Sequence, residues 1–392
     1  MGNDGTREPI LGEPHAPPNL ELISPRPSLF HRFGLSESWR YGSANLLLLL
    51  ASTSLLVGGW VPWLVLTVAM VLGSFADEVG GDDRATLDHG TCVFCKTNLY
   101  LSLPLVCLLA ATLIHFAATQ SSLTREPFQL IVVLWLSGYL FALVGATVAH
   151  ELCHRSSRIA KLSAYALLGF TGNASFVTYH LYAHHRQVGT LADAATARRG
   201  ERLRTFMART LVQQFVQAAR IEAARLRRRG LAPWSWHNRL IVAHVVPLTF
   251  VALAWVFAGA PGVFVIVAAG LLGRLFHELI NYVQHFGLVR VENHPVKEHH
   301  SWDCHRTISN SLHYNLPRHS DHHMSASKDF WRLQAHEQAP MLPYGYQTMA
   351  FIALTPPLWR RIMRPLLADW DLNYASDAER DLVCKREWDG IA

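Results

Sequence analysis

Residues 129–154 read QLIVVLWLSGYLFALVGATVAHELCH, an apolar run that ends in two histidines four positions apart. A helix crosses the bilayer core with about 20 apolar residues, so residues 129–149 alone are long enough for one span. Positions i and i+4 of a helix share a face, so His150 and His154 can reach one metal ion. This stretch therefore predicts a membrane helix that carries metal ligands to one side of the bilayer.

Further apolar runs occur along the chain in pairs with short connections. The run 44–76 is too long for one span, and Gly58, Gly59 and Pro62 divide it in two. Three such pairs of near-span length are hard to bury in a water-soluble core. We therefore expect an all-α fold with six transmembrane spans, at 44–58, 60–76, 97–118, 129–149, 240–258 and 261–285.

The composition agrees with a membrane protein. Of 392 residues, 50% are hydrophobic and 16% are charged, and the mean hydropathy is +0.14. Soluble chains carry about 25% charged residues. The six cysteines are too few for a secreted disulfide framework. The net charge of +6 forms no basic stripe with interleaved aromatic residues, so a nucleic-acid partner is not expected.

The basic residues predict the orientation. Of 35 Lys and Arg, 15 lie in 150–239 and 12 in 286–392, whereas the expected outer loops contain only Arg125. By the positive-inside rule, both termini and both large polar segments are cytoplasmic, in a multi-pass protein of the inner membrane. We expect no cleavable signal peptide, because the N-terminus is polar and rich in proline. The expected divisions are a polar segment 1–43, a membrane-bound domain 44–375 and a cytoplasmic tail 376–392.

Histidines recur at metal-ligand spacing in four segments. HELCH at 150–154 is followed by HLYAHH at 180–185, by NYVQH at 281–285 and by HSDHH at 319–323. All four lie at or below the expected cytoplasmic membrane surface. A catalytic zinc takes about three protein ligands, so this number of imidazoles fits two metal ions. Imidazole binds several metals, so the type of ligand does not identify the metal. The nine candidate ligands are His150, His154, His180, His184, His185, His285, His319, His322 and His323.

Carboxylates beside these ligands are candidate catalytic or supporting groups. A ligating imidazole usually donates its second N–H to a carboxylate or a carbonyl. Glu278 lies on the same helix side as Asn281 and His285, and a buried carboxylate in a span is costly unless it is paired. His277 points elsewhere and is interpreted as packing. The candidate acceptors are Glu151, Glu278 and Asp321, and His299, His300, His305 and His313 are interpreted as either supporting donors or surface residues.

These motifs resemble those of the integral-membrane fatty acid desaturase and hydroxylase superfamily, and within it the AlkB-type alkane 1-monooxygenases. The resemblance extends over about residues 44–375, and xylene-type methyl monooxygenases share most of it. It rests on the spacing between the boxes as well as on the boxes themselves. The matching segments are HLYAHHR at 180–186, RRGE at 198–201, NYVQHFG at 281–287, HSW at 300–302, NLPRHSDHH at 315–323 and PPLWRR at 356–361.

The resemblance implies a cytoplasmic, histidine-rich diiron cap in which the nine histidines hold two non-haem iron ions. It further implies hydroxylation of a terminal methyl C–H by O2, with a medium-chain n-alkane from the bilayer converted to a primary alcohol. Electrons would come from a rubredoxin, or from a ferredoxin-type donor, with its reductase. Cys92 and Cys95 form a lone CxxC, and a rubredoxin iron site needs two such pairs, so the donor is expected to be a separate protein.

Several alternatives stay open. Cys153, Tyr179, Gln284 and Pro317 depart from the alkane pattern beside the ligands; none removes a ligand, but they leave the substrate open. An alkylaromatic methyl hydroxylase, or a fatty-acyl desaturase, hydroxylase or decarboxylase, fits the same boxes. A membrane zinc protease of the HExxH type would leave six of the histidines unexplained. The basic run 225–229 predicts contact with anionic lipid headgroups or with an acidic electron-transfer protein.

Overall fold

The computed structural model describes residues 37–86, 92–119 and 127–384, and within these ranges the chain is helical, without a strand. The expected N-terminal segment 1–43 lies almost wholly outside them. Five helical stretches in the described part are long and apolar enough to cross a membrane: Trp39–Val57, Val61–Val79, Val93–Thr119, Pro127–Cys153 and Arg239–His285.

These stretches are built from helices α2 to α7, α12 and α13, and three of them also contain a short 3-10 or π segment, labelled η. The first contains η1 (Glu37–Gly42) and α2 (Ser43–Val57), and the second contains α3 (Val61–Thr67), η2 (Val68–Leu72) and α4 (Gly73–Val79). The third is α5 (Val93–Thr119), and the fourth joins α6 (Pro127–Leu140), η3 (Phe141–Ala146) and α7 (Thr147–Cys153). The fifth contains α12 (Arg239–Ala243) and α13 (Val245–His285).

The fifth stretch covers both spans that were expected at 240–258 and 261–285. Helix α13 breaks at Gly259, whose φ of 59° and ψ of −150° are accessible to glycine at low cost. Its two arms fold back on each other so closely that a Cβ on Gly262 would lie 2.5 Å from the carbonyl oxygen of Ala254. Five candidate stretches therefore stand where six spans were expected, because two spans join through a sharp turn. The number of crossings and their orientation stay predictions.

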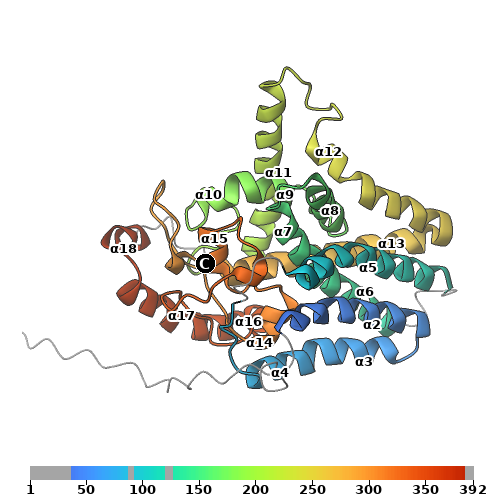
Figure 1. Cartoon of the computed structure of the whole chain (residues 1–392), viewed down its shortest axis with the longest axis horizontal. Helices are drawn as coiled ribbons and strands as arrows, with labels where there is room; N and C mark the ends of the chain where they lie inside the picture. The colour runs from blue at the N-terminus through green and yellow to red at the C-terminus, as the bar shows by residue number, and fades with distance from the viewer. Residues whose placement is uncertain (1–36, 87–91, 120–126, 385–392) are drawn as a thin grey trace, which may run out of the picture.

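The bundle places its metal-ligand segments at one end. In Figure 1 the α2–α3 connection, the end of α5 and the break in α13 lie on the right, whereas α7, α15 (His319–Met324) and the end of α13 meet on the left or in the centre. Helices α2 and α5 run in the same direction, since Asn45 Nδ2 near the start of one donates to the Asn98 carbonyl near the start of the other at 2.8 Å. Both therefore begin at the end where the histidines gather.

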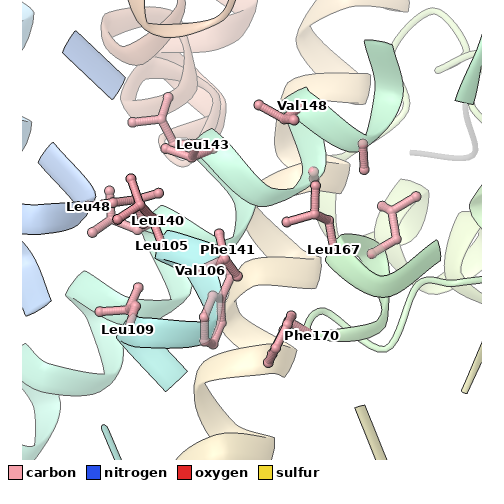
Figure 2. Close-up of a cluster of buried hydrophobic side chains, with 14 of the residues drawn as sticks. Leu48, Leu105, Val106, Leu109, Leu140, Phe141, Leu143, Val148, Leu167 and Phe170 are labelled. Atoms are coloured by element: carbon pink, nitrogen blue, oxygen red, sulfur yellow. The ribbon is translucent and has the colours of Figure 1, made fainter. Parts of the chain in front are cut away.

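The fourth stretch is the centre of the bundle. In its most apolar window 89% of the residues are buried, against 22% for Val61–Val79. Figure 2 shows Leu140, Phe141 and Leu143 of this stretch packed against Leu105 and neighbouring apolar residues of α5. The π segment η3 lies directly before α7, and π turns occur frequently at functional sites. This packing fixes the direction in which α7 presents His150.

Shorter helices form the cap over this end. Within it, Arg318 is fully buried and pairs with Asp83, which also pairs with Arg40 near the first stretch, so the residue before His319 is tied to the bundle. Part of the expected C-terminal tail is helical and packed, as α18. The remaining cap elements are α8 (Arg158–Gly169), α9 (Phe176–Tyr179), η4 (His180–His184), α10 (His185–Gln187), α11 (Leu203–Arg227), η5 (Glu298–His300), α14 (Thr307–Leu312), η6 (Phe330–Arg332), α16 (Tyr346–Ala353), α17 (Pro356–Asn373) and α18 (Asp377–Val383).

Candidate metal centre

Four imidazoles from three separate segments form a first candidate metal group. His150 lies on α7 and His154 directly after it, His180 begins η4, and His322 lies on α15. Each offers a ring nitrogen, and these nitrogens lie within 4.8 Å of one another. The closest pair is His154 Nε2 and His180 Nε2, 3.0 Å apart. The i, i+4 spacing of His150 and His154 thus places both in one group.

A second group combines His184 of η4, His285 at the end of α13, and His319 and His323 of α15. All four side chains are buried, and their ligand atoms again lie within 4.8 Å of one another. His319 Nε2 is the centre of the group, at 3.0 Å from His285 Nε2 and 3.1 Å from His323 Nε2. Residues more than a hundred positions apart in the sequence thus converge on one point.

His185 lies between the two groups. Its ring centroid is 4.8 Å from that of His154 and 4.8 Å from that of His323. Its Nε2 lies 2.9 Å from His180 Nε2. The structure therefore brings all nine sequence-predicted histidines together, as two groups of four with one imidazole that contacts both.

Hydrogen bonds alone do not satisfy these nitrogens. Burial, followed by the neighbouring imidazoles, lowers the pKa of His319 and His323 well below the ordinary value, so both rings are neutral and each has one N–H. His319 Nε2 faces two ring nitrogens at once, while the Nδ1 atoms of His285, His319 and His323 are buried without a partner in the described part of the chain. Unpaired buried donors of this kind need an explanation.

A metal ion bound through the Nε2 atoms would explain why these atoms lie so close together, although it would leave the Nδ1–H groups unpaired. Four nitrogen pairs among the nine imidazoles are only 2.9, 3.0, 3.0 and 3.1 Å apart, and the shortest of them joins His185 to His180. A donor set made only of imidazoles suits Fe, Zn, Cu or Ni. The residues therefore fit a two-metal centre.

Asp193 is the carboxylate that contacts a cluster imidazole. Its Oδ2 accepts from His184 Nδ1 at 3.0 Å and from Thr196 Oγ1 at 2.7 Å, and its Oδ1 accepts from the Tyr179 hydroxyl. Burial acts to raise the pKa of Asp193, but His184 and these hydrogen bonds hold it well below the ordinary value. A charged carboxylate therefore fixes His184 with Nε2 free to bind metal.

Sequence reasoning missed Asp193. The residue stands in no histidine box, and nothing local in the sequence places it against His184. The one signal is that Asp193 is the only charged residue in the stretch 187–197 directly after a histidine box. Tyr179, which departs from the alkane pattern, has a position in the same hydrogen-bond network.

Replacing Asp193 by asparagine should lower metal affinity about 10- to 100-fold, because an amide does not stabilise the N–H of His184 as a carboxylate does. Competition with a chelator on the purified protein measures this change. Asp377→Asn, at an exposed residue of α18, is the matched control and should leave the affinity unchanged. Equal affinity in Asp193→Asn and the wild type would remove Asp193 from the centre.

Glu278 lies on α13, two helical turns before His285, in a separate polar network. Its carboxylate is fully buried, pairs with Arg274 at 3.2 Å and accepts from Gln214 Nε2 at 3.0 Å. Asn281 Nδ2 also donates to it at 3.2 Å, which places both residues on one helix face as expected. These contacts join α13 to α11, and a catalytic role for Glu278 stays a prediction.

The other two predicted carboxylates also bind neighbouring segments. Glu151 pairs with Arg155, and Asp321 accepts from Lys328 Nζ at 2.7 Å and from His336 Nε2 at 2.8 Å. Among the described residues, Glu151, Glu278 and Asp321 make no hydrogen bond with any of the nine imidazoles. Arg155 holds the Glu151 carboxylate in an ion pair, which does not suit the free general base of a zinc protease.

A third group, His299, His300 and Glu379, also has metal-ligand geometry. His300 Nδ1 accepts from the backbone N–H of Lys297 at 2.9 Å, so the proton of the neutral ring is on Nε2. That N–H donates to Glu379 Oε1 at 2.7 Å. The contact therefore docks α18 onto the cap through a hydrogen bond and leaves His300 without a free nitrogen for a metal.

The CxxC pair lies away from these groups, at the start of α5. Cys92 and Cys95 are joined by a disulfide, with their Cα atoms 5.2 Å apart. Cys153, beside the ligands, is buried, and its Sγ–H donates to the His150 carbonyl at 3.0 Å. The remaining cysteines of the described residues are free and do not form a second pair that could complete a rubredoxin-type iron site.

An apolar cavity, part of it open to the surroundings, runs from the imidazoles to the side of the bundle. His150, His184 and His319 line its inner end. Phe351 and Leu354 also line it and are 38% and 49% exposed, which places an opening on the outer face of α16. Most of the lining is apolar, so the space suits a hydrophobic molecule.

The sequence is similar to those of known proteins. The family model described as fatty acid desaturase matches residues 127–353. Alkane 1-monooxygenase 2 of Pseudomonas aeruginosa is 32% identical over 315 residues, which cover 78% of this chain and 83% of that protein. Alkane 1-monooxygenase 1 of the same organism is 33% identical, with 78% and 82% covered. The xylene/toluene monooxygenase hydroxylase component XylM of Pseudomonas putida is 31% identical, with 74% and 79% covered.

Proposed function

Because this chain belongs to the fatty acid desaturase family, we propose that it is a membrane monooxygenase that hydroxylates the terminal methyl group of a medium-chain n-alkane to give a primary alcohol. The observation that carries this proposal is one cavity with apolar walls that ends at two groups of imidazoles. An all-imidazole centre that held iron would supply redox chemistry, and apolar walls select a hydrophobic substrate.

The metal ions are proposed to be two irons, one in each group of four, with His185 available to either. Iron at this position supplies the activation of O2 that no side chain can perform. The chain itself keeps the ligands neutral by burial and fixes His184 through Asp193. The apolar walls exclude water and hold the substrate methyl group at the inner end of the cavity.

The substrate is proposed to enter from the bilayer, where an alkane is soluble. Met70 of η2 and Phe351 and Leu354 at α16 line the cavity toward the outer face of the bundle. That face carries exposed apolar side chains, as a lipid-facing surface does. With the orientation that the positive-inside rule predicts, the cap lies in the cytoplasm.

Product analysis tests this proposal. The iron-loaded protein, with a rubredoxin and reductase as electron donors, is assayed against octane, a xylene and a fatty-acyl chain. Conversion of octane to 1-octanol supports the alkane reading. Conversion of the xylene alone would move the substrate to an alkylaromatic methyl group, the alternative that the similarity to XylM favours. Conversion of none of the three by an iron-loaded protein would overturn the proposal.

Electrons are proposed to enter where the centre comes nearest to solvent. Of the nine imidazoles, only His154 and His185 are partly exposed. Arg158 and Arg186, both exposed, follow these two histidines in the sequence. A basic surface here would attract an acidic electron-transfer protein by long-range charge.

The basic run 225–229 fits a different partner. Arg227, Arg228 and Arg229 are exposed at the end of α11, which projects away from the histidine segments in Figure 1. The adjoining Trp234 and Trp236 are 81% and 78% exposed. Exposed tryptophan beside arginine is typical of a membrane interface, and each basic residue there contributes about 1 kcal/mol of attraction to anionic lipid.

Charge reversal distinguishes the two surfaces. Arg158→Glu with Arg186→Glu should lower turnover with the protein donor about 10-fold or more, because steering raises association rates by about 10- to 1,000-fold. Turnover with a small chemical reductant should stay at the wild-type rate. Arg227→Glu with Arg228→Glu is the matched control and should leave both rates unchanged. An equal fall with both reductants, or an effect confined to the control pair, would contradict this docking surface.

A further inference from the structure

The wall of the main cavity carries several hydrogen-bonding side chains besides the cluster histidines. Most of them are already paired. Tyr139 donates to Gln347 Oε1 at 2.9 Å, Asn281 donates to Glu278, and Gln284 Nε2 donates to the Tyr346 hydroxyl at 3.3 Å. These groups therefore present mainly their carbon atoms to a ligand.

His313 differs from them. Only 8% of its surface is exposed, yet neither ring nitrogen has a hydrogen-bond partner among the residues that the structure describes. Its backbone N–H donates to the Ser309 carbonyl at 3.0 Å, which fixes the ring at the end of α14. Burial lowers the pKa of His313 to about 4, so the neutral ring offers one donor and one acceptor. A buried polar group left unpaired destabilises the folded protein, so a ligand that pairs with it is favoured.

Thr147 lines the same cavity as His313. Its side chain is 7% exposed, and the described residues give its hydroxyl no hydrogen-bond partner. His313 and Thr147 line both the main cavity and a smaller adjoining cavity. His150 and Leu316 also line both cavities, so this part of the wall lies beside a proposed metal ligand. Thr147 precedes His150 by one helical turn on α7.

We infer that His313 and Thr147 form a hydrogen-bonding subsite for an oxygen atom, carried by a hydrophobic chain in the main cavity. The occupant is a primary alcohol: its O–H can donate to the imidazole, and its oxygen can accept from the imidazole or from the threonine hydroxyl. A hydrocarbon leaves both side chains unpaired, so an alcohol binds more tightly than the alkane of equal length. The inference rests on the proposed function, because it places the alcohol in the cavity that would hold the alkane.

Ligand binding to the metal-free protein in nanodiscs tests this subsite. Calorimetry with 1-octanol and with octane gives a Kd for each, and we expect the alcohol to bind about tenfold more tightly, the ratio that one hydrogen bond supplies. His313→Leu should remove this preference by raising the Kd for 1-octanol about tenfold. His313→Gln, which keeps hydrogen-bonding groups, should restore most of it. Leu312→Met, on the same helix turn, is the control for packing.

Thr147→Val keeps the shape of the side chain and removes only the hydroxyl, so it reports on the subsite even if His313→Leu does not fold. A smaller loss of alcohol affinity than in His313→Leu is expected. Equal Kd values for 1-octanol and octane in the wild type would overturn the inference, and so would equal changes for both ligands in each variant. Because the measurement needs no turnover, a protein that fails to hydroxylate octane would still report on the subsite.

Discussion

Replacing His319 by alanine is expected to empty the second metal group and to abolish hydroxylation. His319 Nε2 lies 3.0 and 3.1 Å from the nitrogens of two other ligands, so its loss removes the centre of the group. Losing an outer hydrogen bond costs about 10- to 100-fold in affinity or activity, and losing a ligand at the centre should cost more. Iron analysis should fall from about two to about one per chain.

An exposed histidine is the control for this experiment. His294 lies nine residues after His285, the end of α13, and is exposed. His294→Ala should keep the metal content and the activity of the wild type. If His319→Ala also kept both, His319 would not be a ligand and the two-group arrangement would be wrong.

Replacing Ala146 by phenylalanine is expected to close the inner end of the cavity to substrate. Ala146 lines the cavity one residue before Thr147, and its side chain is buried. If the ring displaces about three methylene groups of the chain at about 0.8 kcal/mol each, kcat/KM for octane should fall about fiftyfold. Overpacking should also cost about 1–3 kcal/mol of stability.

Metal content separates this effect from unfolding. Ala146→Phe should retain the wild-type amount of metal, because Ala146 is not among the ligands. Ala208→Phe, at an exposed position on α11, is the matched control and should leave kcat/KM unchanged. Wild-type kcat/KM for octane in Ala146→Phe would mean that the substrate does not occupy this cavity.

The spans could be predicted from sequence because hydrophobic length is a local property. The fourth expected span, 129–149, lies within the apolar helical stretch Pro127–Cys153, which is long enough to cross a membrane. The fifth stretch shows the limit of this reasoning. A reversal at Gly259, inside a continuous apolar run, joins two expected spans into one helical stretch, and composition does not distinguish a break from a connection.

The candidate ligands could be predicted for a related reason. His150 and His154 share a helix face by spacing, and the ends of α7 and α13 meet because both helices return to the same side of the bundle. Asp193 and the partners of Glu278 could not be predicted, because these contacts join residues that only the tertiary fold brings together. His184 meets Asp193 across a loop, and Glu278 meets Gln214 across two helices.

Metal analysis of the detergent-purified protein, followed by an octane assay of the same preparation, tests the central claim most directly. The proposed diiron centre predicts about two irons per chain and the appearance of 1-octanol in the presence of O2 and an electron donor. One zinc per chain without oxygenation of any substrate would contradict the diiron centre and leave six of the nine histidines without a role.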